Sequence, residues 1–296
     1  MTFHKTVLLN EAVEYLKLQP GKLYVDVTFG GGGHSRKILE SNPDCKLIAI
    51  DWDKKSLEAN SQDLLEEFPD RFQIVWGNFA FLEKVLKKIG VTKISGGILA
   101  DFGTSQAQLI HGTGFSFFKD TFLDMRMSPA HQKITACDII NNYPEKELTK
   151  LFFDLGEEKA SRKIAHAIVE ERKKKIIKTT GHLVEVIEDL IPSRGKIHPA
   201  TKVFQALRIK VNSELENIHS FLNASVNLLD KEGRLVCISF HSLEDRVVKT
   251  FFRENSSEHL PKKVKIITPR VVIATEEEIK ANPSSRSAKL RAAEIL

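Results

Sequence analysis

The fold class follows from the stretch Leu23-Tyr24-Val25-Asp26-Val27-Thr28-Phe29-Gly30-Gly31-Gly32-Gly33-His34-Ser35. An apolar, β-branched run leads into four consecutive glycines, and a helix is expected to begin near the last residue of the stretch. Glycine tolerates positive φ and has no Cβ, so backbone N–H groups and a helix N-terminus can approach an electron-rich ligand group closely. The stretch therefore predicts a strand, a turn that contacts a ligand, and a helix.

Further runs of the same kind extend this unit into a sheet. Apolar runs bounded by turn residues predict strands at Leu23 to Thr28, Lys46 to Ile50, Phe72 to Trp76, Gly97 to Ala100 and Arg234 to Phe240. Helical periodicity separates the first four, and alternating strands and helices imply a parallel sheet covered on both faces. Two more strands are expected near the C-terminus, at Lys263 to Thr268 and Ser287 to Glu294.

The strand signals disappear between Asp101 and Arg234. Helices are predicted there at Glu145 to Gly156, Lys159 to Lys175 and Gly181 to Ile191, and apolar residues then recur every three or four positions from Phe204 to Leu222. Ser213 and Glu216 have the spacing of a capping box, which places a helix start and the return to the first domain near them. We expect a discontinuous α/β domain, 1–104 and 212–296, with a helical domain of 105–211 inserted into it.

Composition is that of a soluble globular protein, and the charge is uneven along the chain. The 296 residues are 42% apolar and 28% charged, which argues against disorder, and the net charge is +5. The segments 1–104, 105–211 and 212–296 carry −1, +5 and +1. The excess therefore belongs to the helical insertion, which contains Arg172-Lys173-Lys174-Lys175; a solvated helix face explains such a run as well as a binding surface does.

Several classes of protein are disfavoured. No stretch reaches the roughly 18 uninterrupted apolar residues of a membrane helix, and Met1 to Lys5 do not begin a signal peptide. We therefore expect a cytoplasmic protein without a membrane partner. Cys45, Cys137 and Cys237 lie far apart without CxxC spacing, so neither a disulfide framework nor a metal site is expected.

The glycine turn and the second strand together describe a nucleoside pocket. That strand ends at Asp51, 18 residues after Gly33, where a carboxylate can accept two hydrogen bonds from a ribose diol. The dinucleotide pattern GxGxxG fails, because its last position is Ser35. This favours S-adenosylmethionine as the ligand; a dinucleotide, as in a dehydrogenase, and a tight turn without any ligand stay open.

Three further residues follow strands at the same edge of the sheet. Phe79 follows the third strand, where it could pack on an adenine or serve as ordinary core. Asp101 ends the fourth strand and either faces the pocket or caps a turn. His241 follows the fifth strand, just before Ser242 and Asp245, whose capping-box spacing predicts that they begin a helix. His241 is then the residue left to explain.

A whole series of motifs resembles the RsmH/MraW family of ribosomal RNA small-subunit methyltransferases. It includes Thr28-Phe29-Gly30-Gly31-Gly32-Gly33-His34-Ser35, Asp101-Phe102-Gly103-Thr104-Ser105, Gly114-Phe115-Ser116-Phe117, Asp124-Met125-Arg126-Met127, His198-Pro199-Ala200-Thr201 and Ser239-Phe240-His241-Ser242-Leu243-Glu244-Asp245-Arg246. The resemblance extends in order from Thr6 to Ser287. It departs from the family pattern at Gln106, where a second serine is usual, and at His166, where an arginine is common.

The resemblance implies a Rossmann-like class I methyltransferase sheet with an inserted helical domain. It implies methyl transfer from S-adenosylmethionine to the N4 amine of a decoding-centre cytidine in 16S rRNA of the small ribosomal subunit. The cofactor contacts carried over from the family are Gly32, Gly33, His34, Asp51, Phe79, Asp101 and Gln108. A methyltransferase-like assembly factor that binds RNA without catalysis is the alternative, and the oligomeric state is left open.

The chemistry adds candidates for catalysis and for RNA binding. A cytosine N4 amine is a poor nucleophile and needs an acceptor for its protons, for which Asp101 is the candidate, while His241 could position the base. The base must lie outside any helical stack, so binding should use single-stranded RNA and phosphate contacts. The basic candidates for those contacts are Arg126, Arg162, Arg172, Lys173, Lys174, Lys175 and Arg208.

Overall fold

The chain folds into two compact units, Met1–Gly103 with Leu215–Leu296, and Thr104–Glu214. A computed structural model describes residues 6–103, 112–130, 132–191, 198–257 and 261–296. From the sequence we expected the boundaries after residue 104 and after residue 211. Along the sequence, the second unit is inserted between the fourth and fifth strands of the first.

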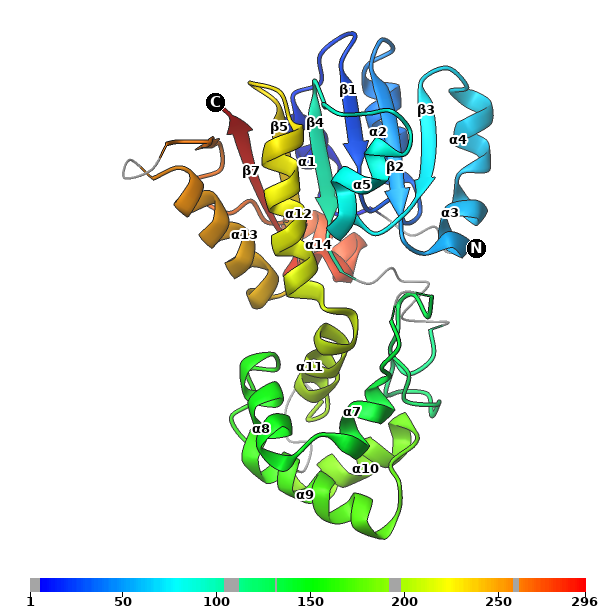
Figure 1. Ribbon diagram of the computed structural model, residues 1–296, viewed down its shortest axis with the longest axis vertical. Coiled ribbons are helices and arrows are strands. Elements are labelled where there is room, and N and C mark those ends of the chain that lie inside the picture. Colours follow the sequence, from blue (N-terminus) through cyan, green and yellow to red (C-terminus); the bar gives the residue numbers. More distant parts are fainter. Residues whose placement is uncertain (1–5, 104–111, 131, 192–197, 258–260) are drawn as a thin grey trace. The chain divides into compact units, whose positions relative to one another are not determined.

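One mixed sheet forms the centre of the first unit (Figure 1). Its strands are β1 (Leu23–Asp26), β2 (Lys46–Asp51), β3 (Phe72–Trp76), β4 (Gly97–Asp101), β5 (Arg234–Ser239), β6 (Val264–Ile266) and β7 (Lys289–Ile295). They run in the order β3-β2-β1-β4-β5-β7-β6, with β7 antiparallel to both neighbours and the remaining pairs parallel. The strands predicted from the sequence are confirmed to within two residues at their ends.

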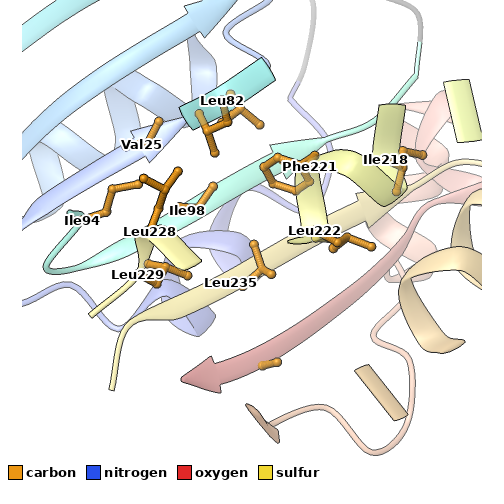
Figure 2. Packing of buried hydrophobic residues seen from close by; sticks show 14 of the residues in the cluster. Val25, Leu82, Ile94, Ile98, Ile218, Phe221, Leu222, Leu228, Leu229 and Leu235 are labelled. Atoms are coloured by element: carbon orange, nitrogen blue, oxygen red, sulfur yellow. The ribbon is translucent and has the colours of Figure 1, made fainter. Parts of the chain in front are cut away.

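Side chains of alternate strand residues supply two separate cores, one on each face of the sheet, because the strand period is two. On one face Val25, Ile98 and Leu235 pack beneath three helices, and Figure 2 shows Phe221 and Leu222 lying against these strand residues. The helices of this face are α5 (Leu82–Lys87), α12 (Glu214–Leu228) and α13 (Ser242–Asn255).

The opposite face uses the intervening residues of the same strands. Tyr24, Leu47, Leu99 and Val236 are buried there in a second core. Its helices are α1 (Leu9–Leu16), α2 (Gly33–Ser41), α3 (Lys54–Asn60), α4 (Gln62–Glu67) and α14 (Glu276–Ala281), and two short 3₁₀ turns complete the unit, η1 (Phe79–Phe81) and η2 (Pro283–Ser287). Helices therefore cover both faces, as the alternation of strands and helices predicted.

The inserted unit is helical, which confirms the predicted helical insertion. Its described helices are α7 (Ala136–Asn142), α8 (Glu145–Asp154), α9 (Ser161–Lys174), α10 (Thr180–Leu190) and α11 (Thr201–Asn212). They share one core that includes Ile140, Phe152, Ile168 and Leu207. Across the described residues, none of the helices has both the length and the apolar composition needed to span a bilayer.

The apolar periodicity from Phe204 to Leu222 belongs to two helices. Ser213 adopts φ 49°, a left-handed conformation that ends α11, and α12 begins at Glu214. A helix thus begins where the capping-box spacing of Ser213 and Glu216 predicted one.

The order of the strands decides where a ligand can bind. β1 and β4 are neighbours, and the chain leaves β1 toward β2 but leaves β4 toward β5. Such a switch point opens a crevice at the carboxyl ends of the two strands, which is where ligands of open α/β sheets bind. The glycine turn after β1 and Asp101 at the end of β4 lie at this point.

Candidate active site

The glycines of the turn differ in how closely other residues surround them. Gly32, with φ +76°, donates its N–H to the Phe29 carbonyl at 2.8 Å, and α2 begins at the next residue. A Cβ added to Gly33 would lie 1.9 Å from Thr6 Oγ1, and one added to Gly32 would lie 2.9 Å from the Phe29 ring. A Cβ on Gly30, with φ +52°, would meet nothing closer than 3.9 Å. Gly30 therefore borders open space, although its N–H and carbonyl already bond Asp51, Ser56 and Asn60, and the predicted ligand contacts of Gly32 and Gly33 stay predictions.

Asp51 ends β2 beside this turn. Its Oδ2 accepts the Gly30 N–H at 2.8 Å and its Oδ1 accepts the Asp53 N–H at 2.9 Å. Burial raises the pKa of this carboxyl to about 6, although the two backbone hydrogen bonds act in the opposite direction. Each carboxylate oxygen has two lone-pair sites, so the ionised group retains acceptor capacity for a diol.

Asp26, the last residue of β1, is a site residue that the sequence analysis missed. It is fully buried, and its carboxylate accepts the Thr28 N–H at 3.1 Å and the Ser35 hydroxyl at 2.7 Å. Burial raises its pKa to about 6. An acidic residue four positions before the first glycine of the turn, within an otherwise apolar run, was the available signal. The contact also gives Ser35 a role at the position where a dinucleotide fingerprint has glycine or alanine.

The structure brings His34 and Asp101 together at the switch point. His34 Nε2 lies 3.1 Å from the Val7 carbonyl, to which it can only donate, and Nδ1 lies 3.8 Å from Asp101 Oδ2. Asp101 Oδ1 is buried and has no hydrogen-bond partner within the described part of the chain. Burial, with the nearby charges of Asp26 and Glu244, raises the pKa of Asp101 well above its usual value. Asp101 is thus a carboxyl group that favours holding a proton.

Phe79 packs on neighbouring aromatic rings and stays partly exposed. Its ring packs against Trp52 at 6.2 Å between centroids and against Phe102 and Phe221 at 5.8 Å each. The residue is only partly buried, and it begins η1 directly after Asn78, whose side chain caps that turn. The two roles weighed for it are therefore compatible, since one edge packs on the core and part of the ring stays accessible.

Helix α13 begins at Ser242, close to where the capping-box spacing of Ser242 and Asp245 predicted a helix. Its N-cap is His241, one residue before Ser242. The Nδ1 of His241 accepts the Glu244 N–H at 3.4 Å, while Glu244 Oε2 accepts the N–H groups of Phe240 and His241. His241 Nε2 lies 3.2 Å from Glu244 Oε1. The capping-box pattern looks for a hydroxyl at the N-cap, so it did not identify His241, whose imidazole nitrogen acts as the acceptor instead. Helix capping explains His241, and its catalytic role stays a prediction.

Three of the seven basic RNA-binding candidates make internal contacts. Arg126 forms a two-pronged ion pair with Asp124 at 2.6 and 3.0 Å, and Arg208 forms another with Glu214 at 2.9 Å for each contact. Arg172 donates to the Ile140 carbonyl at 2.7 Å. These contacts hold the inserted unit together, so they leave less of each guanidinium for a phosphate.

The other candidates are exposed side chains of the inserted unit. Lys173 and Lys174 pair with Glu170 and Glu171 one turn back on α9, pairs of the surface kind that contribute little stability. Arg162 and Lys175 are also exposed. Gln108, the remaining predicted cofactor contact, lies outside the described residues.

The family profile and the most similar relatives in sequence agree on one family. The profile of the MraW methylase family matches residues 1–296. The protein named ribosomal RNA small subunit methyltransferase H from Sulfurihydrogenibium sp. is 47% identical over 98% of each chain, and its namesake from Clostridioides difficile is 44% identical, also over 98% of each. Among solved structures, a putative methyltransferase from Streptococcus mutans in complex with SAH aligns with a TM-score of 0.43 and 11% identity over 99% of this chain and 100% of that one.

Proposed function

Since the chain belongs to the MraW methylase family, we propose that it methylates the N4 amine of a decoding-centre cytidine in 16S rRNA, with S-adenosylmethionine as methyl donor. Relatives named for small-subunit rRNA methylation match along the whole chain. The observation that carries the proposal in the structure is the convergence of Gly30, Asp51, His34 and Asp101 at the switch point of the sheet.

The residues at this edge fit the cofactor. The backbone of Gly30 borders open space, and the Asp51 carboxylate retains lone pairs for ribose hydroxyls after accepting two backbone hydrogen bonds. Phe79 offers part of an aromatic ring at the neighbouring strand end. When bound, the cofactor supplies an electrophilic methyl group on a sulfonium sulfur. The chain's own part is to hold and orient it, with Gln108 as a further expected contact.

Asp101 is the group that can take the proton which the N4 amine must lose. The amine lone pair is delocalised into the ring, so an acceptor for an amine proton makes the nitrogen more nucleophilic. The raised pKa of Asp101 makes its ionised form a stronger base than an ordinary carboxylate, and His34 Nδ1 lies 3.8 Å from its Oδ2. Orienting the cofactor is a second role open to the same carboxylate.

The inserted unit is the proposed RNA-binding part. It carries the positive charge of the chain, and a single-stranded substrate is required because the N4 amine must leave any helical stack to reach the reaction centre. Its partner is then the 16S rRNA of the small subunit, and its place in the cell is the cytoplasm, where that subunit is found.

The test is methyl transfer from labelled S-adenosylmethionine to unmodified small subunits, followed by nucleoside analysis. The expected product is N4-methylcytidine, and its absence would overturn the proposal. Asp101→Asn should fold, bind S-adenosylhomocysteine and lose turnover. Full turnover with unchanged cofactor affinity in this variant would remove both roles given to Asp101. A thermal shift with S-adenosylhomocysteine but none with NAD separates a methyltransferase from a dehydrogenase.

A further inference from the structure

A loop of the inserted unit, residues 114–124, is held tightly against the start of α10. Thr121 N donates to Thr180 Oγ1 at 3.0 Å, and Thr180 N donates back to the Thr121 carbonyl at 2.9 Å. Gly181 N donates to Asp120 Oδ1 at 2.8 Å, and a Cβ on Gly181 would lie within 2.8 Å of that oxygen. The loop therefore has a defined conformation, set by hydrogen bonds on both sides of the contact.

This loop presents a phenylalanine to solvent. Phe118 is 88% exposed, and its ring packs on Phe117 with 4.7 Å between centroids. Phe117 in turn stacks on His198 at 4.6 Å and meets Phe204 edge-on at 5.3 Å. A single exposed apolar side chain is ordinary, but this one is supported by a row of rings and lies on a fixed loop. The result is an aromatic platform with an accessible ring.

Two exposed lysines belong to the segments that form this contact. Thr180 Oγ1 donates to the Lys119 carbonyl at 3.0 Å and Leu123 N donates to the Lys178 carbonyl at 2.9 Å, so both exposed lysines come from backbone that lines the loop. The acidic residue between them, Asp120, accepts hydrogen bonds from the start of α10, and these lower its pKa. Phe122, 46% exposed, is the second exposed phenylalanine of the same loop.

We infer that Phe118 stacks on an unpaired base of the substrate RNA, with Lys119 and Lys178 contacting the adjoining phosphates. The inference rests on the proposed function and names a contact for it on the inserted unit. An accessible aromatic ring on a loop with exposed lysines in the loop and in the segment bonded to it matches single-stranded RNA, whose bases stack on aromatic side chains while its phosphates need cations. An apolar protein partner would match the rings but would leave the two ammonium groups without counter-charges.

The test measures the affinity of the full-length protein for a fluorescent single-stranded RNA of the substrate region at several salt concentrations. Phe118→Ala should weaken binding about tenfold without changing the slope of log K against log salt, because stacking releases no counterions. Phe118→Tyr should retain the affinity. Lys178→Gln should reduce the slope by about 0.7. Phe153→Ala, at a phenylalanine of α8 that is 60% exposed, is the matched control and should bind normally.

Unchanged affinity in Phe118→Ala, or an equal loss in Phe153→Ala, would overturn the inference. A loss of self-association in Phe118→Ala with unchanged RNA affinity would also overturn it and assign the ring to a contact between copies of the chain. Methyl transfer by the wild-type protein is scored separately. If no N4-methylcytidine forms but Phe118→Ala still weakens RNA binding, the proposed function fails and the stacking platform stands.

Discussion

The Ser35 hydroxyl donates a 2.7 Å hydrogen bond to Asp26 Oδ2 at a place that solvent does not reach. It ties the first turn of α2 to the end of β1 across the glycine turn, and so it holds the two sides of the proposed cofactor pocket in register. The pair also keeps a carboxyl group in the interior, where ionisation is costly.

Asp26→Asn should make the stability of the protein less dependent on pH. The pKa of Asp26 rises from an ordinary 3.8 to about 6 on folding, so the folded protein binds more protons than the unfolded chain between about pH 4 and pH 6. Its contribution to the free energy of unfolding is therefore lost as the pH rises through that window. We expect the variant to match the wild type near pH 4 and to be more stable at pH 7 by about 2 kcal/mol in urea unfolding. An identical pH profile would show that Asp26 titrates normally.

Asp51→Asn should weaken cofactor binding and remove its dependence on pH near 6. In the wild-type protein the carboxyl has a pKa of about 6, and only its ionised form accepts hydrogen bonds from both ribose hydroxyls. The affinity for S-adenosylhomocysteine should therefore fall as the pH drops below 6, measured by calorimetry. Asp53→Asn removes a neighbouring charge that raises the pKa of Asp51, so this variant should keep the pH dependence but move its midpoint to lower pH. A flat wild-type profile would contradict the assignment.

Gly33→Ala should destabilise the first unit through a clash that a second substitution relieves. The new Cβ would lie 1.9 Å from Thr6 Oγ1, and overpacking of this kind costs about 1–3 kcal/mol. Adding Thr6→Ala removes that oxygen and should restore most of the loss in thermal unfolding. Gly30→Ala meets nothing closer than 3.9 Å, but its φ of +52° strains an alanine by about 1–2 kcal/mol, so Thr6→Ala should not rescue this variant. Equal destabilisation of the single and double variants would exclude the clash.

Neutralising Lys173, Lys174 and Lys175 to Gln should weaken RNA binding and flatten its salt dependence. If all three contact phosphates, the slope of log K against log salt should fall by about 2. Arg172 is left in place because its guanidinium donates to the Ile140 carbonyl and supports the fold. The matched control neutralises three other exposed lysines of the same unit, Lys146, Lys150 and Lys159. Equal slopes for the two triple variants would make the run a solvated face.

His241→Asn separates helix capping from catalysis. Asparagine is a good N-cap, so this variant should keep the stability of α13 and normal turnover, whereas His241→Ala should lose about 1 kcal/mol of stability in urea unfolding. A stable His241→Asn protein with little turnover would instead assign the imidazole to the reaction. If His241 only caps the helix, the turnover of the folded variant stays unchanged, so turnover is the measurement that distinguishes the two roles.

Local pattern was enough to predict the elements of the fold. Strand periodicity located the strands from Leu23 to the C-terminus, and helical periodicity located the insertion, because both patterns repeat over neighbouring residues. The motifs that resemble the family were sufficient to name the chemistry, and the resemblance implied that His34 and Asp101 contact the same cofactor before their distance was known. The sequence showed that Ser35 departs from the GxGxxG pattern, but it did not show that the Ser35 hydroxyl bonds Asp26.

Two details of the site depend on how separate elements pack. The hydrogen bond of Ser35 to Asp26 joins α2 to β1, and Gly33 lies against Thr6, so neither contact can be read from spacing. Arg126, Arg172 and Arg208 are a different case, because their positive charge suggested RNA contacts and their partners lie within the inserted unit. A charge count records the sign of a side chain and not its partner.

The sequence by itself determined the order of strands and helices, the inserted helical segment and the membership of the family, because these depend on periodicity and on motifs of adjacent residues. Only the tertiary structure decided that Gly30 borders open space, that Asp26, Asp51 and Asp101 have raised pKa values, and that Phe118 is a supported, exposed ring. The physical reason is that burial and partner choice depend on which distant segments exclude water from a side chain.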